Sequence, residues 1–180
     1  MTRLSTERLV LSNLGEDDAP YILQLLNDPD WIRFIGDRKV RTLEDARVYL
    51  RNGPIAMYAR EGFGLYRTAL ASDDTPIGMC GLIRRPTLAD VDIGFAFLPA
   101  YRGCGYAFES AAAVIEHART LGLERVVAIV SPDNVPSATL LGRLHFLRER
   151  TILLADDDEP LDLYARDLAG PAPQTITGRP

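Results

Sequence analysis

The hydrophobic positions along the chain change their period several times, and each change predicts a different element. Residues 8–14 alternate loosely between apolar and polar side chains, which is typical of a strand, and Gly15 follows them. Between residues 16 and 27 the apolar positions recur at helical spacing, acids occupy the first turn, and Asp28-Pro29 ends the pattern. The amino-terminal region therefore predicts a strand followed by a helix.

A second helix is predicted from Thr42 to about Arg51. Thr42 and Asp45 have the spacing of a capping box, in which a hydroxyl and an acid three positions apart each accept a hydrogen bond from the other residue's backbone N–H. Between the two predicted helices, residues 31–35 form a short apolar segment before Gly36. This segment either lines a pocket or caps the core.

The middle of the chain has the pattern of consecutive strands. Segments 62–71 and 76–84 are apolar and separated by the polar residues 72–75, which suit a hairpin loop, so we predict an antiparallel pair. Residues 91–98 form a third strand in the same run, and Pro99 closes it.

The second half of the chain alternates between helices and strands. A long alanine-rich helix runs to about Leu121, where Gly122 ends it. The β-branched segment 125–130 follows, and the strand–helix–strand order predicts that it lies parallel to the strand before the helix. The remaining predicted elements are a helix at 134–144 and two strands at 146–154 and 161–167, on either side of an acidic turn at 156–159.

The predicted order β-α-α-β-β-β-α-β-α-β-β indicates an α/β (α+β) fold, with one mixed sheet of about six to seven strands and helices on both faces. The chain has 180 residues, of which 47% are hydrophobic and 25% charged, which is the composition of one globular domain. We predict a single domain at 1–168 and a mobile tail, rich in Pro, Gly and Thr, at 169–180.

Composition narrows the classes of partner. The formal net charge is -5, whereas nucleic-acid partners call for a basic face, so no nucleic acid is expected and an amine-bearing partner is favoured. The two cysteines, Cys80 and Cys104, do not have the number or spacing of a disulfide framework or a zinc site, which fits a reducing, cytoplasmic setting. No apolar run approaches the ~20 residues of a membrane span, and the amino terminus lacks the apolar region of a secretory signal, so no membrane contact is expected.

The segment most suggestive of chemistry joins the strand at 91–98 to the long helix. A helix that begins at a glycine-rich turn offers unpaired N–H groups and a partial positive charge, both of which attract phosphates. Gly103 and Gly105 lack Cβ atoms, so a diphosphate could approach the main chain closely, and Arg102 could add a charge-assisted contact. The segment matches neither the Walker loop nor the dinucleotide pattern. Taken alone, it is equally consistent with a tight turn whose glycines serve packing.

Wider context resolves this ambiguity. Arg102-x-x-Gly105-x-Ala107 resembles the Q/R-x-x-G-x-G/A signature of the GNAT N-acetyltransferase family. Asn134-x-x-Ser137-x-x-Leu140, followed by Leu144-His145-Phe146, looks like the N-x-x-A/S-x-x-L…G-F segment of that family. The opening Thr6-Glu7-Arg8-Leu9-Val10-Leu11 is similar to the start of the branch that contains the ribosomal-protein N-terminal acetyltransferases RimJ and RimL. The resemblance covers residues 7–168 and implies a mostly antiparallel sheet with a splayed pair of central strands.

The resemblance implies transfer of an acetyl group from acetyl-CoA, a co-substrate, to an amine, with no metal. The acceptor would be a protein N-terminal α-amine or, alternatively, a small-molecule amine. A non-catalytic CoA-binding sensor is a third possibility, and a homodimer is compatible with the fold. By the same resemblance, the cofactor-binding residues are Phe95 and Phe97 through their main chain, the loop residues Arg102, Gly103, Cys104, Gly105, Tyr106 and Ala107, and Asn134 and Ser137 from the other side.

Catalysis by direct attack requires a neutral amine, yet an alkyl amine with a pKa near 10 is mostly protonated at neutral pH, so a base is needed. Asp92, on the strand that leads to the loop, is the candidate base; the alternatives are a relay through water and a solvent-facing position for Asp92 on the opposite side of the sheet. For the leaving thiolate, many family members use a tyrosine seven residues after the asparagine, but Leu141 occupies that position here. A serine is proposed to act in RimL-like enzymes, so the resemblance implies Ser137 as the candidate acid.

Three further residues need an interpretation. Cys104 is a candidate nucleophile, because a thiol at a helix start can have a lowered pKa, but its slot in the signature is variable and direct transfer needs no acyl-enzyme. His145 replaces the family's glycine, either as a local change or as one that alters the acceptor side. His117 is expected on the solvated face of its helix.

Overall fold

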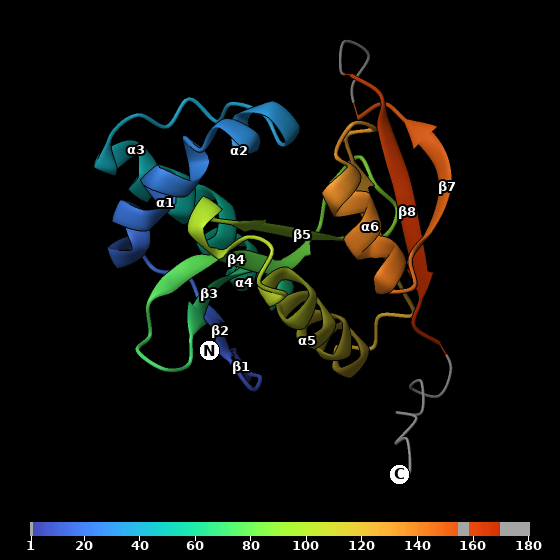
Figure 1. The fold of residues 1–180 in the computed structure, drawn as a ribbon, viewed down its shortest axis with the longest axis horizontal. Helices are drawn as coiled ribbons and strands as arrows, with labels where there is room; N and C mark the ends of the chain where they lie inside the picture. Colours follow the sequence, from blue (N-terminus) through green and yellow to red (C-terminus); the bar gives the residue numbers. More distant parts are fainter. Residues whose placement is uncertain (1, 155–158, 170–180) are drawn as a thin grey trace.

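One eight-stranded sheet organises the computed structural model, which describes residues 2–154 and 159–169 (Figure 1). Its strand order is β1-β2-β3-β4-β5-β6-β8-β7. The strands are β1 (Arg3–Ser5), β2 (Leu9–Asn13), β3 (Leu65–Leu70), β4 (Pro76–Ile83), β5 (Val91–Phe97), β6 (Arg125–Val130), β7 (Leu147–Ile152) and β8 (Leu161–Asp167). The core of the predicted acidic turn, at 156–158, and the predicted tail from residue 170 lie outside the described residues.

The mixed sheet is confirmed, but the predicted count of six to seven strands is too low. The additional strand is β1, which pairs antiparallel with β2 from Arg3↔Ser12 to Ser5↔Val10. A three-residue strand at a sheet edge is too short to show a period in sequence, so only the pairing reveals it. Among the described strands, β5 and β6 make the one parallel pair, as the strand–helix–strand order predicts.

The predicted helices occur in the predicted order, and the structure adds short helical segments between them. The first predicted helix is a 3-10 turn, η1 (Glu16–Asp18), that continues into α1 (Ala19–Leu26), and the apolar segment around Trp31 is a short helix, α2 (Pro29–Phe34). Trp31 is buried against α1 and α3, so the core interpretation is correct for this residue. The other described helices are α3 (Leu43–Leu50), the π-helical turn η2 (Arg51–Ile55), α4 (Ala56–Glu61), the 3-10 turn η3 (Pro99–Tyr101), α5 (Tyr106–Thr120) and α6 (Val135–Arg143).

The start of α3 confirms the predicted capping box. Thr42 Oγ1 accepts a hydrogen bond from the Asp45 amide at 3.1 Å, and Asp45 Oδ2 accepts one from the Thr42 amide at 2.9 Å. The turn η2 and helix α4 were not predicted, because Gly53 and Pro54 interrupt the sequence there. In the structure, Tyr58 of α4 stacks on Tyr66 of β3, with ring centroids 5.9 Å apart. Tertiary packing thus supports a helix that its local sequence does not favour.

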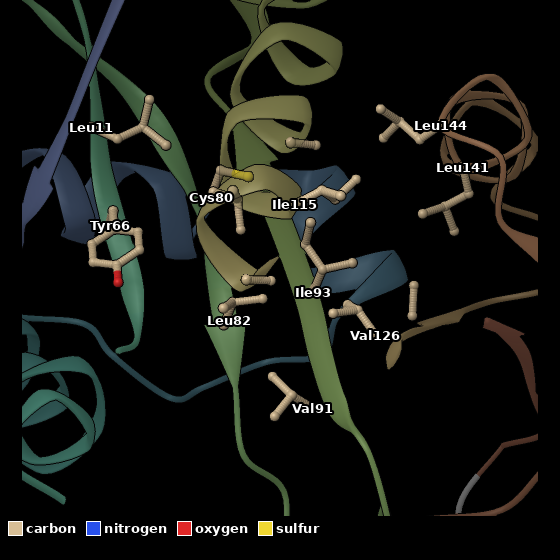
Figure 2. Close-up of a cluster of buried hydrophobic side chains, with 14 of the residues drawn as sticks. Leu11, Tyr66, Cys80, Leu82, Val91, Ile93, Ile115, Val126, Leu141 and Leu144 are labelled. Atoms are coloured by element: carbon tan, nitrogen blue, oxygen red, sulfur yellow. The ribbon is translucent and has the colours of Figure 1, made fainter. Parts of the chain in front are cut away.

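The two faces of the sheet carry different helices. On the first face, α5 packs over the centre of the sheet, and Figure 2 shows Leu141 and Leu144 of α6 pointing towards this cluster, which also contains Ile93 of β5 and Val126 of β6. On the second face, α1, α2 and α3 pack against Met79 and the half-buried Ala96. We call these the α5 face and the α1–α3 face. Because side chains alternate along β5, Ile93, Phe95 and Phe97 face α5, whereas Asp92 and Ala96 face the other side.

Strand β5 is held very differently along its two edges. Its register with β4 is continuous from Gly78↔Phe97 to Ile83↔Asp92. With β6 it pairs only at Val91↔Val126 and Asp92↔Val127. From Ile93 onward, β5 and β6 therefore diverge, and we call this opening the split. It separates a larger half of the molecule, with β1 to β5 and α1 to α5, from a smaller half with β6, β8, β7 and α6 (Figure 1).

Candidate active site

The open edge of β5 presents main-chain groups to the split. The amide of Leu98 donates to the carbonyl of Ile77 at 2.9 Å, which fixes the alternation of hydrogen bonds between β4 and β5. By that alternation the N–H and C=O of Ala96 face β4, whereas those of Phe95 and Phe97 face the split. Apart from the Phe97 carbonyl, which Arg102 occupies, these groups are available to a ligand that runs along β5 as an additional strand would.

The loop after β5 ends in an array of unpaired amides. Gly103 and Gly105 adopt left-handed backbone conformations, with φ of 73° and 84°, and Gly105 is the N-cap of α5. The amides of residues 103–108 donate no hydrogen bond to any described residue, and the first amide that does is that of Glu109, which donates to Gly105 at 3.1 Å. Successive free amides at the start of a 15-residue helix are a suitable binding site for phosphate oxygens.

Arg102 is placed differently from the rest of the loop. Its amide donates to the carbonyl of Pro99 at 3.2 Å, and its guanidinium donates to the Phe97 carbonyl and to Asp28 and Asp30 beside α2. The backbone amide and the guanidinium of Arg102, which were both candidates for phosphate binding, therefore donate hydrogen bonds to acceptors within the protein. A contact between Arg102 and phosphate stays a prediction.

Arg8 occupies the position beside the loop that the sequence suggested for Arg102. Its Nη1 donates to the carbonyl of Cys104 at 3.0 Å, and its guanidinium carbon lies 4.6 Å from the centre of the Tyr106 ring. Its Nε donates to Glu109 at 2.7 Å, and Thr6 donates to the same carboxylate. Although burial acts to raise it, these hydrogen bonds hold the pKa of Glu109 below its ordinary value. Sequence reasoning used Thr6 and Arg8 only as a family signature and missed this role.

Asn134 and Ser137 lie at the start of α6, at the carboxyl end of β6. Because parallel strands have their carboxyl ends at the same edge, α6 starts at the same end of the split as the loop after β5. The side-chain oxygen of Asn134 accepts a hydrogen bond from the Ser137 amide at 3.2 Å, so Asn134 caps α6. Ser137 is half-buried.

Asp92 lies at the closed end of the split, on the α1–α3 face. Its carboxylate is buried, and Oδ2 is 2.6 Å from Nε of Arg85, in the loop before β5. Its Oδ1 accepts no hydrogen bond of normal geometry from the described residues. Arg85 and the backbone of Ile129 on β6 both act to lower the pKa of Asp92. Burial is the largest influence and raises the pKa of Asp92 to about 6 despite Arg85. A buried carboxyl with such a pKa can accept a proton near neutral pH.

The predicted site residues do not all meet at one point. A strand rises ~3.3 Å per residue, so Asp92 lies ~10 Å along β5 from Phe95 and ~17 Å from Phe97. The free amides of residues 103–108 and α6 lie at the open end of the split, and Asp92 lies at its closed end. A group held by the main chain of Phe95 is therefore too far from Asp92 for direct proton transfer.

The remaining predicted residues have clear positions. Leu141, in the family's tyrosine slot, is fully buried in the core and brings no hydroxyl to the split. Cys104 is exposed in the loop, with Sγ 3.5 Å from the Arg102 carbonyl. The prediction for His117 is wrong: it is half-buried, with Nε2 3.2 Å from the Tyr66 hydroxyl.

His145 takes over the backbone role of the family's glycine. Its φ is 62°, a left-handed conformation, and the amides of His145 and Phe146 donate to the carbonyls of Gly142 and Leu141, both at 3.0 Å. These two bonds form the Schellman motif that ends α6, which glycine usually completes. The side chain is exposed, so the structure favours the interpretation of a local change.

Beside the loop, an open hollow of about 580 Å³ lies along α5. Its lining combines the apolar side chains of Phe108, Ala112 and Ala113 with two arginines, Arg8 and Arg143, and three acids, Glu7, Glu109 and Glu116. The guanidinium of Arg143, on α6, lies 4.7 Å from the centre of the Phe108 ring. An aromatic ring beside two arginines offers a stacking surface for a planar base, whereas the three carboxylates make the hollow less suited to a phosphate.

Comparison with known proteins agrees with this geometry. Residues 8–147 match the family described as Acetyltransferase (GNAT) domain. The chain belongs to the GNAT acetyltransferase family. Within it, the chain is 29% identical over 153 residues to the uncharacterized N-acetyltransferase p20 of Bacillus licheniformis, a match that covers 83% of this chain and 84% of the relative.

Solved structures of GNAT proteins share the fold. An acetyltransferase from Agrobacterium tumefaciens superposes with a TM-score of 0.79 and 26% identity, covering 92% of this chain and 94% of the other. RimL, a ribosomal L7/L12 α-N-protein acetyltransferase solved in complex with coenzyme A, superposes with a TM-score of 0.76 and 21% identity, covering 92% of this chain and 98% of the other. At that identity the RimL structure demonstrates the common fold.

Two structural findings concern other classes of site. Across residues 2–154 and 159–169, no group of three or more His, Cys, Asp or Glu side chains is arranged to hold a metal ion. In the same part of the chain, every helix is too short or too polar to cross a membrane.

Proposed function

We propose that this protein transfers an acetyl group from acetyl-CoA to a primary amine by direct attack. The observation that carries the proposal is the split itself: the open edge of β5 leads from the loop of free amides at 103–108 to the buried carboxylate of Asp92. The coenzyme A complex of RimL, which has the same fold, supports the choice of ligand. The hollow beside α5 offers a stacking surface for the base at the nucleotide end of the same molecule.

The roles of the residues follow from their positions. The amides after Arg102 would hold the diphosphate, and the main chain of Phe95 would pair with the pantetheine arm and donate a hydrogen bond to the thioester carbonyl as negative charge develops on it. The neutral amine attacks the carbonyl carbon, its proton passes through water to Asp92, and the carbon–sulfur bond breaks. The hydroxyl of Ser137 is the group proposed to protonate the departing thiolate.

The acceptor that we propose is a protein N-terminal α-amine. RimL, named as an α-N-protein acetyltransferase, supports this choice through the shared fold. The packing of the smaller half is compatible with it: on the α1–α3 face, the cluster of Val127, Leu163 and Ala165 packs against strand and loop residues, with no helix among the described residues of that cluster.

Two successive measurements test the proposal, the first of acetyl-CoA binding and the second of acetyl transfer. Calorimetry should detect binding of acetyl-CoA by the wild-type protein, whereas Gly105→Glu should abolish it because the new carboxylate occupies the phosphate position next to Arg8. A matched control is Gly122→Glu, because Gly122 also has a left-handed φ, has free space for a side chain and lies beyond the opposite end of α5. Normal binding by a folded Gly105→Glu variant would remove the loop from its proposed role.

The second measurement is release of free CoA with a panel of acceptors. Peptides with varied N-termini should release CoA above the rate of N-acetylated versions of the same peptides. Release only with polyamines, amino acids or other small amines would replace the peptide acceptor with a small-molecule one. Binding of acetyl-CoA without release for any amine would identify a CoA sensor, for which the buried Leu141 in the tyrosine slot is the supporting feature.

A further inference from the structure

Arg102 connects three segments that are distant in sequence. Its Nε donates to the Phe97 carbonyl at 2.9 Å, its Nη1 to Asp30 Oδ2 at 2.6 Å, and its Nη2 to Asp28 Oδ1. The Asp28 side chain is only 6% exposed, so its pairing with Arg102 compensates a carboxylate held away from water. The guanidinium therefore lies between the end of β5 and the start of α2.

Helix α2 is attached at both of its ends. At its start, Asp28 is the N-cap, and its Oδ1 accepts hydrogen bonds from the amides of Asp30 and Trp31 as well as from Arg102. At its end, Arg33 pairs at 2.7 Å with Asp133, in the loop between β6 and α6. The larger half contributes α2, and the smaller half contributes Asp133. A helix of six residues thus bridges the open end of the split.

We propose that Arg102 is a positioning residue that couples occupation of the phosphate-binding loop to the ordering of α2. The inference rests on the proposed function, because the ligand of the loop is taken to be CoA. A diphosphate bound by the amides after Arg102 restrains the backbone of Arg102, and through its guanidinium restrains Asp28 and the first turn of α2. Since α2 borders the α1–α3 face, acetyl-CoA would thereby prepare the acceptor side before the amine arrives.

Coupling of this kind is reciprocal. If bound CoA raises the equilibrium constant for ordering of α2 by some factor, an ordered α2 raises the affinity for CoA by the same factor. Such couplings between sites typically amount to 5–150-fold. The alternative is that Arg102 binds phosphate directly, as its place in the signature suggests. The two possibilities differ in what they predict for Asp28, which belongs to α2 and is not part of the loop.

The test compares two variants by hydrogen exchange and calorimetry with CoA as the probe. Arg102→Gln removes the guanidinium, which is the loop's contribution to the ion pairs with Asp28 and Asp30. Asp28→Asn removes the charge from the α2 side but keeps a good N-cap oxygen, so the helix start is preserved. Arg47→Gln is the control, because Arg47 is an exposed arginine of α3 whose described ion pair is with Glu44.

In the wild-type protein and in Arg47→Gln, CoA should slow exchange of the α2 amides, including those of Ile32 and Ile35, about fivefold or more. In Arg102→Gln and in Asp28→Asn this protection should fall below twofold, while CoA still binds within about tenfold of the wild-type affinity. Arg102→Lys, which can keep one ion pair, should give an intermediate value.

Three outcomes would overturn the proposal, each in a recognisable way. CoA binding without protection of α2 in the wild-type protein would reject the coupling and leave the proposed function standing. Loss of CoA binding in Arg102→Gln, with normal binding and normal α2 protection in Asp28→Asn, would make Arg102 a direct phosphate ligand. Absence of CoA binding by the wild-type protein would reject the proposed function and the coupling together.

Discussion

The two edges of β5 show how one strand serves both folding and function. Towards β4 it is paired from Asp92 to Phe97, and Gly78 lets the two backbones approach so closely that an added Cβ would lie 2.3 Å from the Ala96 carbonyl oxygen. Towards β6 it is paired at two positions and then open. The closed edge fixes the position of β5, and that rigidity lets the open edge present main-chain groups to a ligand without collapsing onto β6.

The largest expected effect comes from proline at adjacent positions of β5. Ala96→Pro removes an N–H that faces β4 and should lower the free energy of unfolding by about 3 kcal/mol or more. Phe95→Pro removes an N–H that faces the split. Compared with Phe95→Ala, it should lower the free energy of unfolding by about 1 kcal/mol or less, yet it should weaken CoA binding at least tenfold. Denaturant unfolding and calorimetry give the two numbers. Equal destabilisation by the two prolines would contradict the assigned alternation of the strand.

A smaller effect, on catalysis, is expected from Asp92, the last residue of β5 that pairs with β6. Asp92→Asn should lower kcat/KM about 10²-fold, because the amide cannot accept the proton of the amine. With a pKa of about 6, wild-type Asp92 loses its own proton as the pH rises through 6, so wild-type kcat/KM should rise across that range and the variant should show no such rise. Initial rates between pH 5 and 8 provide the measurement, and a parallel profile for both proteins would exclude Asp92 as the base.

The same carboxyl has a predictable effect on stability. Because its folded-state pKa lies above the ordinary value of 3.8, the folded protein holds this proton more tightly than the unfolded chain does. Its contribution to the free energy of unfolding is fully present below about pH 4 and is lost as the pH rises through about 6. The stability of wild type relative to Asp92→Asn should therefore decrease between those pH values. An increase would show that Arg85 outweighs burial.

The smallest effect is expected away from both edges of β5. His145→Gly relieves a left-handed conformation at the end of α6, which for a residue with a Cβ costs about 1 kcal/mol, partly offset by the greater freedom of glycine in the unfolded chain. The free energy of unfolding should rise by about 0.5 kcal/mol, with CoA binding unchanged. Altered CoA binding or altered choice of acceptor would instead place His145 at the site.

Sequence patterns predicted most of the architecture, because periodicity and capping are local. The bounds of β6 and β8, the capping box of Thr42 and Asp45, and the loop of glycines before α5 all agree with the structure. Elements with weak local signals were missed: β1 is three residues long, and α4 follows Gly53 and Pro54. Their stability comes from pairing with β2 and from packing of Tyr58 on Tyr66.

By itself, the sequence determined which main-chain groups would be free, since two glycines before a helix leave amides unpaired wherever the chain places them. It could not determine where long side chains would go. Arg102 and Arg8 are both cations that a phosphate could use, yet Asp28 and Asp30 draw the guanidinium of Arg102 to α2, and Glu109 holds Arg8 beside the loop. Asp92 likewise acquires its raised pKa only from burial at the closed end of the split. Long-range charge pairing and burial depend on residues tens of positions away, so the tertiary structure alone decides them.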